Sequence, residues 1–520
     1  MKVVISYPPL NSEKGCPTLG QNRQFQYFNK PTFIYPVVPA QAATLLNEAG
    51  HEVIWNDCLA QGWNYQQFLD FIRKEKPDLI AFETKTPVIK QHWKIINEIK
   101  SLFPSAGTVP VRALNCITRG TVPEESNWTV PKTVLFGDHV SALPEESFQN
   151  SKVDFVLTGG DYDFLLLNLC NELKEPNLGN LEPGIWYREN GGIKNTGEFQ
   201  LNHDLNSLPF IDRELTGWQS YAFKNGNYKR TPGTYIMSSR DCWYHACTFC
   251  SWPTLYPKFR ARSVENVLDE IGELIDKYNV REIMDDSGCF SVGEWLRDFC
   301  KGAIKRGINK KIYLDCNMRF GALSDEDFSL MKKANFRLLL FGLESANQNT
   351  LDRINKNVTE DRIIQDCICA VKAGLFPHIT IMFGYPWESY ESALNTLKLG
   401  SWLLKKGYAY TMQATIVIPY PGSRLFKECK DNGWLKSIDW DDYDMKQPVM
   451  RSPITDEKLM GLVRKMYKVS FQPEFILRKI SAMKDIDDLK YSLRAAKQVL
   501  GHVFDFKARK GCSAFEENQG

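Results

Sequence analysis

Three cysteines lie close together in the middle of the chain. Cys242, Cys247 and Cys250 fall within nine residues, whereas the other eleven cysteines are spread over the 520-residue sequence. They follow the apolar run 234–238, which predicts a strand, and they precede an amphipathic pattern at 264–275 with Ser263 as its N-cap. We therefore expect three thiols on a loop at the C-terminal end of a strand, where α/β folds place their chemistry.

Three neighbouring thiolates suit an iron–sulfur cluster or zinc. Structural zinc usually takes four ligands in two separated pairs, and the sequence has no second pair with that spacing. His245 lies inside the loop and would be a cramped fourth ligand. A disulfide would leave one thiol over, and disulfides are rare in the cytosol. We favour an iron–sulfur cluster held by three cysteines, with one iron open to a small-molecule ligand.

The same segment resembles the radical S-adenosylmethionine (SAM) enzymes. Their usual signature is C-x3-C-x2-C with an aromatic residue before the last cysteine, and Phe249 is that aromatic here. The phrase Cys-Thr-Phe-Cys-Ser-Trp-Pro at 247–253 looks like the subgroup that also carries a cobalamin-binding domain. The sequence departs from the signature by one residue, because Cys242 and Cys247 enclose four residues instead of three.

Length and composition place the chain among ordinary globular proteins. We expect about two to four domains in 520 residues. The 64 basic and 62 acidic residues leave a net charge of +2, and no basic stripe suggests a nucleic-acid partner. No apolar run approaches the ~20 residues of a membrane span. Cysteines without paired spacing suggest reduced thiols in the cytoplasm.

Strand-like runs alternate with helical patterns between residues 3 and 157, which predicts a doubly wound, Rossmann-like parallel sheet. Neither a dinucleotide fingerprint nor a P-loop is present. The segment resembles the cobalamin-binding domain that precedes the cluster domain in one radical SAM subfamily, most clearly in Gly-Asp-His-Val-Ser-Ala-Leu-Pro-Glu-Glu at 137–146. This resemblance implies cobalamin contacts at the strand ends, from Pro9, Thr86, Gly137, Asp138, His139, Ser141, Gly159 and Gly160.

His139 does not lie in the D-x-H-x-x-G motif that supplies a cobalt ligand elsewhere, because Gly137 and Ala142 occupy the positions of the Asp and the last Gly of that motif. We favour a hydrogen-bonded loop histidine near the corrin over a cobalt ligand. After the fifth strand, the subfamily usually has Gly-Glu-x-Glu, and this chain has Gly-Asp-Tyr-Asp at 160–163.

Six strand-like runs between 234 and 418 predict a partial (β/α)6 barrel, and each ends in polar residues. Asp286 and Glu344 suit the ammonium and ribose of SAM, Arg319 suits its carboxylate, and Phe249 offers a face to the adenine. Gly-Leu-Glu-Ser at 342–345, which includes Ser345, resembles the SAM contact on strand four of the superfamily. The alternative is that these polar residues cap strands in solvent.

The expected order of domains is a cobalamin-binding domain at 1–182, a hairpin and linker at 183–230, a radical SAM barrel at 231–430 and a helical region at 431–520. Residues 105–131 look like an insertion, and the last ten residues look disordered. Trp-Asp-Asp-Tyr-Asp at 440–444 is either an active-site segment or a surface acidic patch. Tyr385, Trp387 and Tyr420 are candidates for the substrate wall, although core packing explains each singly.

The resemblance is nearest to oxygen-independent Mg-protoporphyrin monomethyl ester cyclases and hopanoid-associated members. It implies a [4Fe-4S] cluster, SAM and cobalamin as cofactors. It also implies reductive SAM cleavage to a 5′-deoxyadenosyl radical, with C-methylation of an unactivated carbon of a small molecule. The alternatives are an oxidative cyclase or rearrangement enzyme without methyl transfer, and a non-catalytic cobalamin or iron–sulfur protein. A flavodoxin- or ferredoxin-type electron donor, no nucleic acid and a cytoplasmic location are expected.

Overall fold

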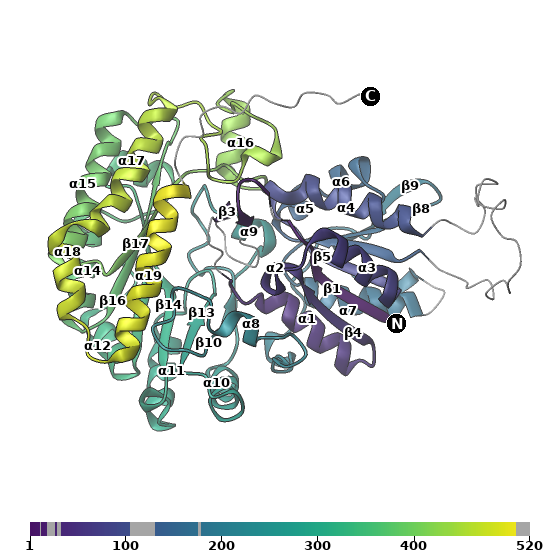
Figure 1. Cartoon of the computed structure of the whole chain (residues 1–520), viewed down its shortest axis with the longest axis horizontal. Helices are drawn as coiled ribbons and strands as arrows, with labels where there is room; N and C mark the ends of the chain where they lie inside the picture. Colours follow the sequence, from purple (N-terminus) through teal and green to yellow (C-terminus); the bar gives the residue numbers. More distant parts are fainter. Residues whose placement is uncertain (11, 18–26, 29–32, 104–129, 175–177, 506–520) are drawn as a thin grey trace, which may run out of the picture.

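The computed structural model describes residues 1–10, 12–17, 27–28, 33–103, 130–174 and 178–505. These residues form two α/β units that lie side by side, with a helical C-terminal region beside the second unit (Figure 1). The expected insertion at 105–131, apart from its last two residues, and the last ten residues of the chain lie outside the described residues.

The first unit is built on a seven-stranded sheet with the order β4-β1-β5-β6-β7-β8-β9. Five of its strands are parallel, and the hairpin of β8 and β9 extends the sheet in the antiparallel sense. The strands are β1 (Lys2–Tyr7), β4 (Glu52–Asp57), β5 (Leu79–Glu83), β6 (Lys132–Phe136), β7 (Phe155–Leu157), β8 (Ile185–Glu189) and β9 (Gly192–Asn195).

Both faces of this sheet are buried, which confirms the doubly wound expectation. In β1, Val3 and Ile5 belong to one hydrophobic core and Val4 to another, as the alternation of side chains along a strand requires. The first core is covered by α1 (Val37–Glu48) and α7 (Tyr162–Lys174), and the second by α3 (Tyr65–Glu75) and α4 (Ile89–Leu102). The shorter helices are α2 (Cys58–Gln61), α5 (Asp138–Ala142), α6 (Pro144–Asn150) and α8 (Gln219–Ala222).

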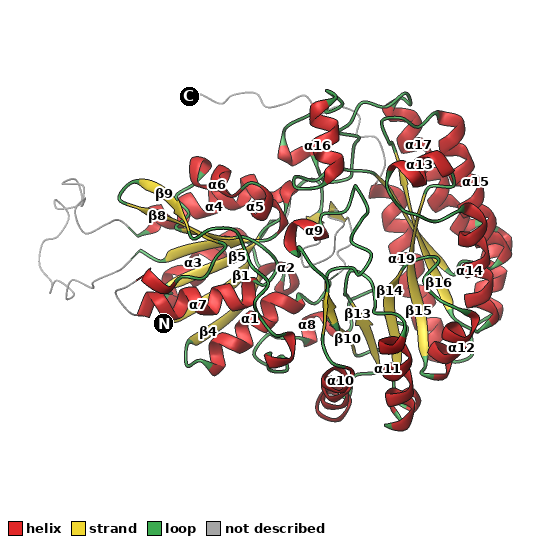
Figure 2. Cartoon of the chain, turned by 180° about the vertical axis from the view of Figure 1, so that it is seen from behind, coloured by secondary structure: helices red, strands yellow, loops and turns green. Residues whose placement is uncertain are grey.

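The second unit contains six parallel strands in sequence order, which confirms the partial (β/α)6 barrel. They are β10 (Gly233–Ile236), β13 (Glu282–Asp285), β14 (Tyr313–Met318), β15 (Phe336–Glu344), β16 (Phe376–Phe383) and β17 (Thr411–Ile416). The outer helices are α10 (Val264–Tyr278), α11 (Glu294–Lys305), α12 (Asp325–Lys333), α14 (Glu360–Lys372) and α15 (Tyr390–Lys406). Figure 2 shows these helices outside the fanned strands. The Ser263 hydroxyl caps α10 as expected, accepting from the Asn266 N–H.

The C-terminal region is helical, as the sequence predicted. It contains α16 (Arg424–Asp431), α17 (Asp456–Lys468), α18 (Pro473–Ser481) and α19 (Ile486–Asp505), together with the 3-10 turn η6 (Trp440–Asp442). Helix α17 is held against the barrel by a buried apolar side that includes Leu459, Val463 and Met466. Elsewhere in this region, η6 contacts α4 of the first unit, so the C-terminal region touches both units.

The carboxyl ends of the two sheets share one interface. Gly160, which follows β7, donates its N–H to the Leu255 carbonyl at 2.8 Å, and Leu255 ends α9 (Trp252–Leu255) just after the cysteine loop. Polar residues at the strand ends of both units therefore lie along a common boundary, where ligands of α/β sheets bind.

Candidate active site at the boundary of the two sheets

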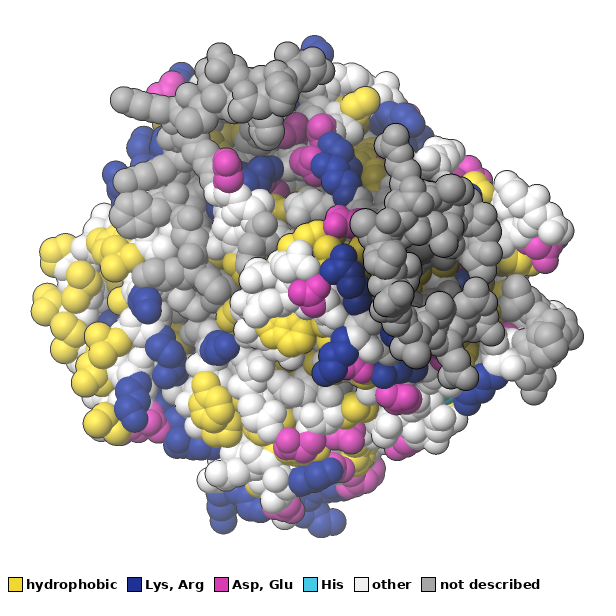
Figure 3. All heavy atoms as spheres, turned by 45° about the vertical axis from the view of Figure 1, so that its right-hand side comes forward, with side chains coloured by type: hydrophobic (Ala, Val, Ile, Leu, Met, Phe, Trp, Pro, Cys, Tyr) yellow, Lys and Arg dark blue, Asp and Glu magenta, His cyan; other side chains and the backbone are white. Residues whose placement is uncertain are grey.

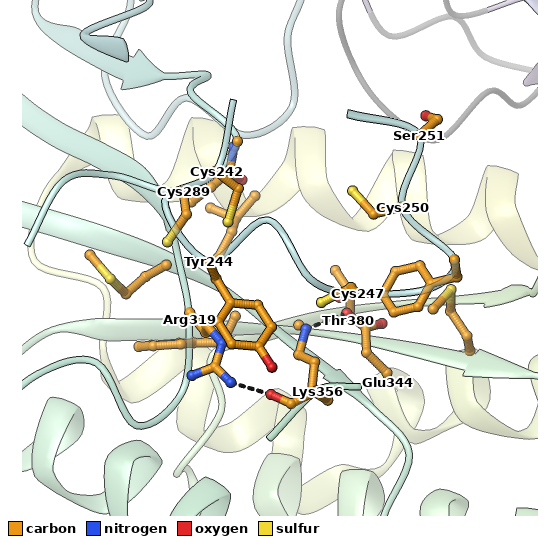
Figure 4. Close-up of a pocket in the computed structure, with 18 of the residues that line it drawn as sticks. Cys242, Tyr244, Cys247, Cys250, Ser251, Cys289, Arg319, Glu344, Lys356 and Thr380 are labelled. Atoms are coloured by element: carbon orange, nitrogen blue, oxygen red, sulfur yellow. Dashed lines mark hydrogen bonds and ion pairs between the residues drawn. The ribbon is translucent and has the colours of Figure 1, made fainter. Parts of the chain in front are cut away.

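The cysteine loop leaves the barrel after β10. Its two sides are joined by β11 (Ser239–Arg240) and β12 (Arg260–Ala261), which pair in the antiparallel sense. Cys242, Cys247 and Cys250 are half-buried and line one cavity of about 200 Å³ at the mouth of the barrel. Figure 4 shows the three side chains arranged around one open space. The structure thus brings together the three thiols that the sequence singled out.

The extra residue between the first two cysteines is accommodated by left-handed backbone on either side of Cys242. Asp241 has φ +75° and His245 has φ +54°. The His245 Nδ1 is hydrogen-bonded to the Asp241 Oδ2, which closes the loop across Cys242. Burial raises the pKa of Asp241 to about 6. Gly288 lies against this turn, and a Cβ there would be 2.7 Å from the Asp241 carbonyl oxygen.

Several parts of the barrel hold the loop from outside. The Trp243 Nε1 donates to the Phe290 carbonyl at 3.1 Å, and the Tyr244 hydroxyl donates to the Asn355 carbonyl at 2.7 Å. The Thr248 N–H donates to the Ile354 carbonyl at 3.0 Å. The loop is therefore fixed by contacts to the segments that follow β13 and α13 (Gln348–Arg353) as well as by its own backbone.

The donor set fits an iron–sulfur cluster better than a single zinc ion. Among the described residues, no three His, Cys, Asp or Glu side chains are placed to share one metal ion. A [4Fe-4S] cluster makes a different demand, because each of its cysteines binds a different iron. Burial raises the pKa of the Cys247 thiol, and the nearby Lys356 ammonium opposes this effect by favouring the thiolate.

Four of the five residues expected to contact SAM line the same cavity as the cysteines: Phe249, Asp286, Arg319 and Glu344. The neighbouring Asp285 has another position. Its carboxylate accepts the N–H groups of Ser238 at 3.1 Å and Ser287 at 2.9 Å, so it ties the end of β10 to the end of β13. Alternate residues of a strand face opposite sides, which explains why only the second aspartate reaches the cavity.

Arg319 is held in the cavity wall by stacking and hydrogen bonds. Its guanidinium lies 3.8 Å from the centre of the Tyr244 ring. It donates to the carbonyls of Phe320 at 3.1 Å and Asn357 at 3.0 Å. These contacts fix the plane of the guanidinium at the edge of the cavity.

Lys356 is a cavity residue that the sequence analysis missed. Its ammonium lies 3.0 Å from the Glu344 Oε1, and both side chains are buried. Burial lowers the pKa of Lys356, but Glu344 and Cys247 together outweigh this effect, so that the pKa is raised overall. The ammonium also lies 5.8 Å from the Phe249 ring centre. No periodicity signals this residue, because it comes from an irregular segment after α13 (Gln348–Arg353).

The structure corrects the expected position of Ser345. Its side chain does not line the cavity, and its hydroxyl donates to the Glu388 Oε1 at 3.1 Å on the buried side. Glu388 also accepts from the Asn347 Nδ2 at 3.1 Å, and burial raises the pKa of Glu388 to about 7. Ser345 comes after the end of β15, and the left-handed backbone of Glu344, with φ +61°, directs the chain so that Ser345 lies behind the wall. It belongs to a polar cluster behind the cavity wall.

Of the three aromatic candidates for the substrate wall, Tyr420 lines the cavity, and its hydroxyl donates to the Tyr443 carbonyl at 3.1 Å. Tyr385 is fully buried and stacks on Trp387, with 5.4 Å between the ring centres, and neither residue lines the cavity.

The residues expected to contact cobalamin gather at the carboxyl edge of the first sheet, after β1, β5, β6 and β7: Pro9, Thr86, Gly137, Asp138, His139, Ser141, Gly159 and Gly160. Gly137 has φ +124°, and a Cβ there would lie 2.3 Å from the Thr84 carbonyl oxygen. The Ser141 hydroxyl accepts the Gly159 N–H at 3.0 Å, which joins the ends of β6 and β7.

A second cavity, of about 400 Å³, opens beside this edge. Ser141, Thr158, Gly159, Trp186 and Phe199 are among the residues that line it. Gly160 lies differently: a Cβ at this position would be 2.1 Å from the Tyr256 ring, so Gly160 packs against the segment after α9. Of the Gly-Gly pair, the first residue thus faces the cavity and the second faces the other unit.

His139 is fully buried, and both of its ring nitrogens have partners. Nδ1 lies 3.1 Å from the Thr86 hydroxyl, and Nε2 lies 3.1 Å from the Glu146 Oε2. The Trp440 Nε1 donates to the other oxygen of Glu146 at 2.8 Å. This arrangement supports a hydrogen-bonded histidine rather than a cobalt ligand.

The acidic segment at 440–444 joins the two units. Asp441 pairs with Lys90 at 2.9 Å, and the buried Asp444 pairs with Lys14 at 2.7 Å. Met445, next in the chain, lines the cavity of the cysteines. The segment is therefore neither a free surface patch nor a set of carboxylates in the cavity: Asp441 and Asp444 contact the first unit, and Met445 reaches the site.

A buried ionic network connects the first sheet to the residue before the cysteine loop. The Arg240 guanidinium donates to Asp161 at 2.6 Å and to Asp163 at 2.9 Å. Arg260 donates to Asp161 at 2.6 Å, and His203 Nδ1 lies 3.4 Å from Asp161. Although burial raises the pKa of Asp161, Arg240, His203 and Arg260 together outweigh it and hold this pKa below its usual range. The Gly-Asp-Tyr-Asp variation thus supplies two carboxylates to the interface.

Comparison with known proteins identifies the second unit. The family model of the radical SAM superfamily matches residues 236–400, which include the cysteine loop and most of the barrel. Residues 236–400 are a radical SAM domain. The match confirms the resemblance that the cysteines and the Gly-Leu-Glu-Ser phrase indicated.

Relatives align far beyond the radical SAM domain. An uncharacterized methyltransferase of Pyrococcus horikoshii is 25% identical over 451 residues, covering 86% of this chain and 90% of the relative. The anaerobic magnesium-protoporphyrin IX monomethyl ester cyclase of Rubrivivax gelatinosus is 23% identical over 490 residues, covering 91% and 80%.

Solved structures share the fold of the whole chain. The cobalamin-dependent SAM radical enzyme OxsB superposes with a TM-score of 0.67 at 15% identity, covering 96% of this chain and 71% of that one. The radical SAM methyltransferase TsrM of Kitasatospora setae superposes with a TM-score of 0.65 at 12% identity, covering 96% and 98%. These likenesses show that the radical SAM domain is joined to the first sheet in a known arrangement.

None of the helices in the described part of the chain has the length and apolarity to cross a membrane.

Proposed function

We propose that the chain is a cobalamin-dependent radical SAM enzyme that methylates an unactivated carbon of a small molecule. Residues 1–182 are the proposed cobalamin-binding domain and residues 231–430 the SAM-cleaving barrel. The observation that carries the proposal is the shared boundary of the two sheets: the proposed cobalamin edge and the cysteine cavity are joined by the Gly160–Leu255 hydrogen bond and by the Arg240 network. The fold of OxsB, which was solved with aqua-cobalamin and SAM bound, supports it.

When bound, a cluster with SAM supplies a 5′-deoxyadenosyl radical, and methylcobalamin supplies a methyl group. Cys242, Cys247 and Cys250 would hold the cluster. Glu344 offers a carboxylate oxygen for the ammonium or ribose of SAM, and its other contact is the buried ion pair with Lys356 at 3.0 Å. Arg319, fixed by Tyr244, offers a planar cation for the SAM carboxylate.

Part of the cavity wall is apolar. Ile34, Val417, Ile418 and Met445 line it, next to Tyr420. Such a wall excludes water from a reactive carbon and strengthens the polar contacts inside. A small-molecule substrate with a substantial apolar part is the ligand we expect there.

On the cobalamin side, Thr86 and His139 hold each other in place, while Ser141 and Gly159 border the 400 Å³ cavity. We propose that this cavity receives part of the cofactor, and that the missing side chain at Gly137 lets β6 continue past Thr84 without collision. Pro9 and Asp138 complete the edge from the neighbouring strand ends.

A flavodoxin- or ferredoxin-type protein in the cytoplasm is the proposed electron donor. The second candidate reaction is an oxidative cyclisation without methyl transfer, which the resemblance to the Rubrivivax cyclase favours. The two reactions differ in the fate of SAM, because methyl transfer also produces S-adenosylhomocysteine.

The test is anaerobic reconstitution with iron, sulfide and hydroxocobalamin, followed by reductant and SAM. We expect 5′-deoxyadenosine and S-adenosylhomocysteine from the wild type, and no 5′-deoxyadenosine from Cys250→Ala. Cys369→Ala is the matched control, because this half-buried thiol on α14 does not line the cavity. Deoxyadenosine without S-adenosylhomocysteine would favour the cyclase, and neither product would indicate a non-catalytic binding protein.

The corrin site is tested separately by Gly137→Ala. The new methyl group would meet the Thr84 carbonyl, so we expect the variant to retain at least about tenfold less cobalamin after gel filtration. Gly62→Ala also replaces a glycine with positive φ, +73°, but nothing lies within 4 Å of the added Cβ, and it should retain cobalamin like the wild type. Equal retention by both variants would remove this edge from the proposed site.

A further inference from the structure

The outer surface of the two last helices exposes an unusual number of apolar side chains. Among the described residues, thirteen large apolar side chains are exposed, and eight of them lie between residues 471 and 500. These eight are Phe471, Ile476, Leu477, Ile480, Ile486, Leu489, Leu493 and Leu500. Figure 3 shows hydrophobic side chains gathered at the left of the view, with Lys and Arg side chains next to them. We call this set of eight residues the α18–α19 face.

The exposed side chains of α19 form one stripe. Ile486, Leu489, Leu493 and Leu500 are separated by three, four and seven residues, which places them on one side of a helix. Tyr491 lies on the opposite side and is only 5% exposed. Phe475 is the buried anchor of α18 in the same way. Both helices are therefore fixed to the barrel by other residues, and their apolar stripes are directed outward.

The charges beside the stripe are mainly basic. Lys490 and Lys497 are exposed on the same helix, one residue or four residues from stripe positions, and Lys484 is exposed just before α19. A helix with an apolar stripe bordered by lysines has the composition of an interfacial membrane-binding helix.

The aspartates at the start of α19 form ion pairs with residues of the barrel. Asp485 pairs with Arg230 at 2.6 Å, Asp487 with Arg281 at 3.1 Å and Asp488 with Lys229 at 2.9 Å. Their charges are thus balanced by residues of the barrel, and Lys484, Lys490 and Lys497 outnumber Glu474, the exposed carboxylate of α18, so a partner would meet a net positive charge.

We propose that the α18–α19 face docks on a membrane surface that contains anionic lipids. The apolar side chains enter the headgroup region, and Lys484, Lys490 and Lys497 lie near the lipid phosphates. A second copy of the chain is a poorer occupant, because a two-fold contact would bring the same lysines of both copies together. The association is peripheral, since the described helices include none that spans a membrane. This inference does not depend on the reaction that the chain catalyses.

The test is sedimentation of the full chain with vesicles of phosphatidylcholine and phosphatidylglycerol, and with vesicles of phosphatidylcholine alone. We expect binding to the anionic vesicles that weakens as salt is added. The double variant Leu489→Glu/Leu493→Glu should bind at least about tenfold more weakly, because it places acids in the stripe. Ile304→Glu is the matched control, an exposed apolar residue on α11 that should leave binding unchanged.

Two outcomes would overturn the proposal. One is wild-type protein that binds neither kind of vesicle at low salt, or a double variant that binds both kinds of vesicle as tightly as the wild type does. The other is a wild type that elutes as a dimer, does not bind vesicles and becomes monomeric in the double variant, which would make the face a subunit interface. Circular dichroism of the variants checks that they are folded.

Discussion

At the scale of single residues, the cavity depends on a buried ion pair. Glu344 ends β15 with φ +61°, beside a register shift between Gly342 and Glu344, and this backbone presents its carboxylate to Lys356. A buried carboxylate without a cation would be costly, and a buried lysine would tend to lose its proton. Each charge therefore lowers the cost of burying the other.

The two members of this pair should be energetically coupled. We expect Lys356→Met to lower the free energy of unfolding by about 3 kcal/mol, because it leaves Glu344 buried without its cation. Glu344→Gln/Lys356→Met should be more stable than the sum of the two single variants predicts. Denaturant unfolding of the wild type, both single variants and the double variant measures this coupling, and additive values would contradict it.

At the scale of elements, the cysteine loop combines left-handed backbone with hydrogen bonds to the barrel. The four-residue spacing between its first two cysteines is tolerated because Asp241 and His245 both adopt left-handed backbone and are hydrogen-bonded to each other. Residues with short polar side chains reach this conformation more easily than β-branched ones.

Variants of His245 test whether this turn places the cysteines. His245→Asn can adopt the left-handed conformation and donate a hydrogen bond from its side-chain amide, so we expect it to bind nearly the wild-type amount of iron and sulfide. His245→Val has neither property and should bind at most about half. The measurement is iron and sulfide per chain after anaerobic reconstitution, with circular dichroism as the check on folding. Equal cluster content in the two variants would show that the turn is dispensable.

At the scale of the whole molecule, an ionic network holds the two sheets together. Asp161 accepts from Arg240, Arg260 and His203, which come from three segments of the chain. His203 also lies 2.8 Å from Glu182. Burial lowers the pKa of His203, but its two carboxylate partners outweigh this effect and raise it to about 9.

This raised pKa predicts how stability depends on pH. Protonated His203 favours the folded state, so its contribution is complete below about pH 6.5 and is lost as the pH rises through about 9. Because the imidazole is partly solvated, we expect a loss of about 1 to 2 kcal/mol of unfolding free energy over that range. His203→Gln should remove this part of the pH dependence. Parallel pH profiles for wild type and variant would refute the assignment.

Much of the fold and part of the site could be predicted from local patterns. The strands of both sheets were predicted because alternating apolar residues and helical periods are short-range signals. Cys242, Cys247, Cys250 and Phe249 were recognisable because they are adjacent in the sequence. Lys356 was not, because its partner Glu344 is reached through an irregular segment. Ser345 lies behind the cavity wall, because its direction follows from the left-handed backbone of Glu344 and not from its motif.

The sequence by itself determined the fold class and the thiol chemistry, since both depend on residue type and spacing over a few positions. Only the tertiary structure decided which polar side chains share a space. Arg240 meets Asp161 across 79 positions of the sequence, and Trp440 meets Glu146 across 294. Such contacts depend on how one sheet is oriented against the other, and no local pattern in either segment contains that orientation.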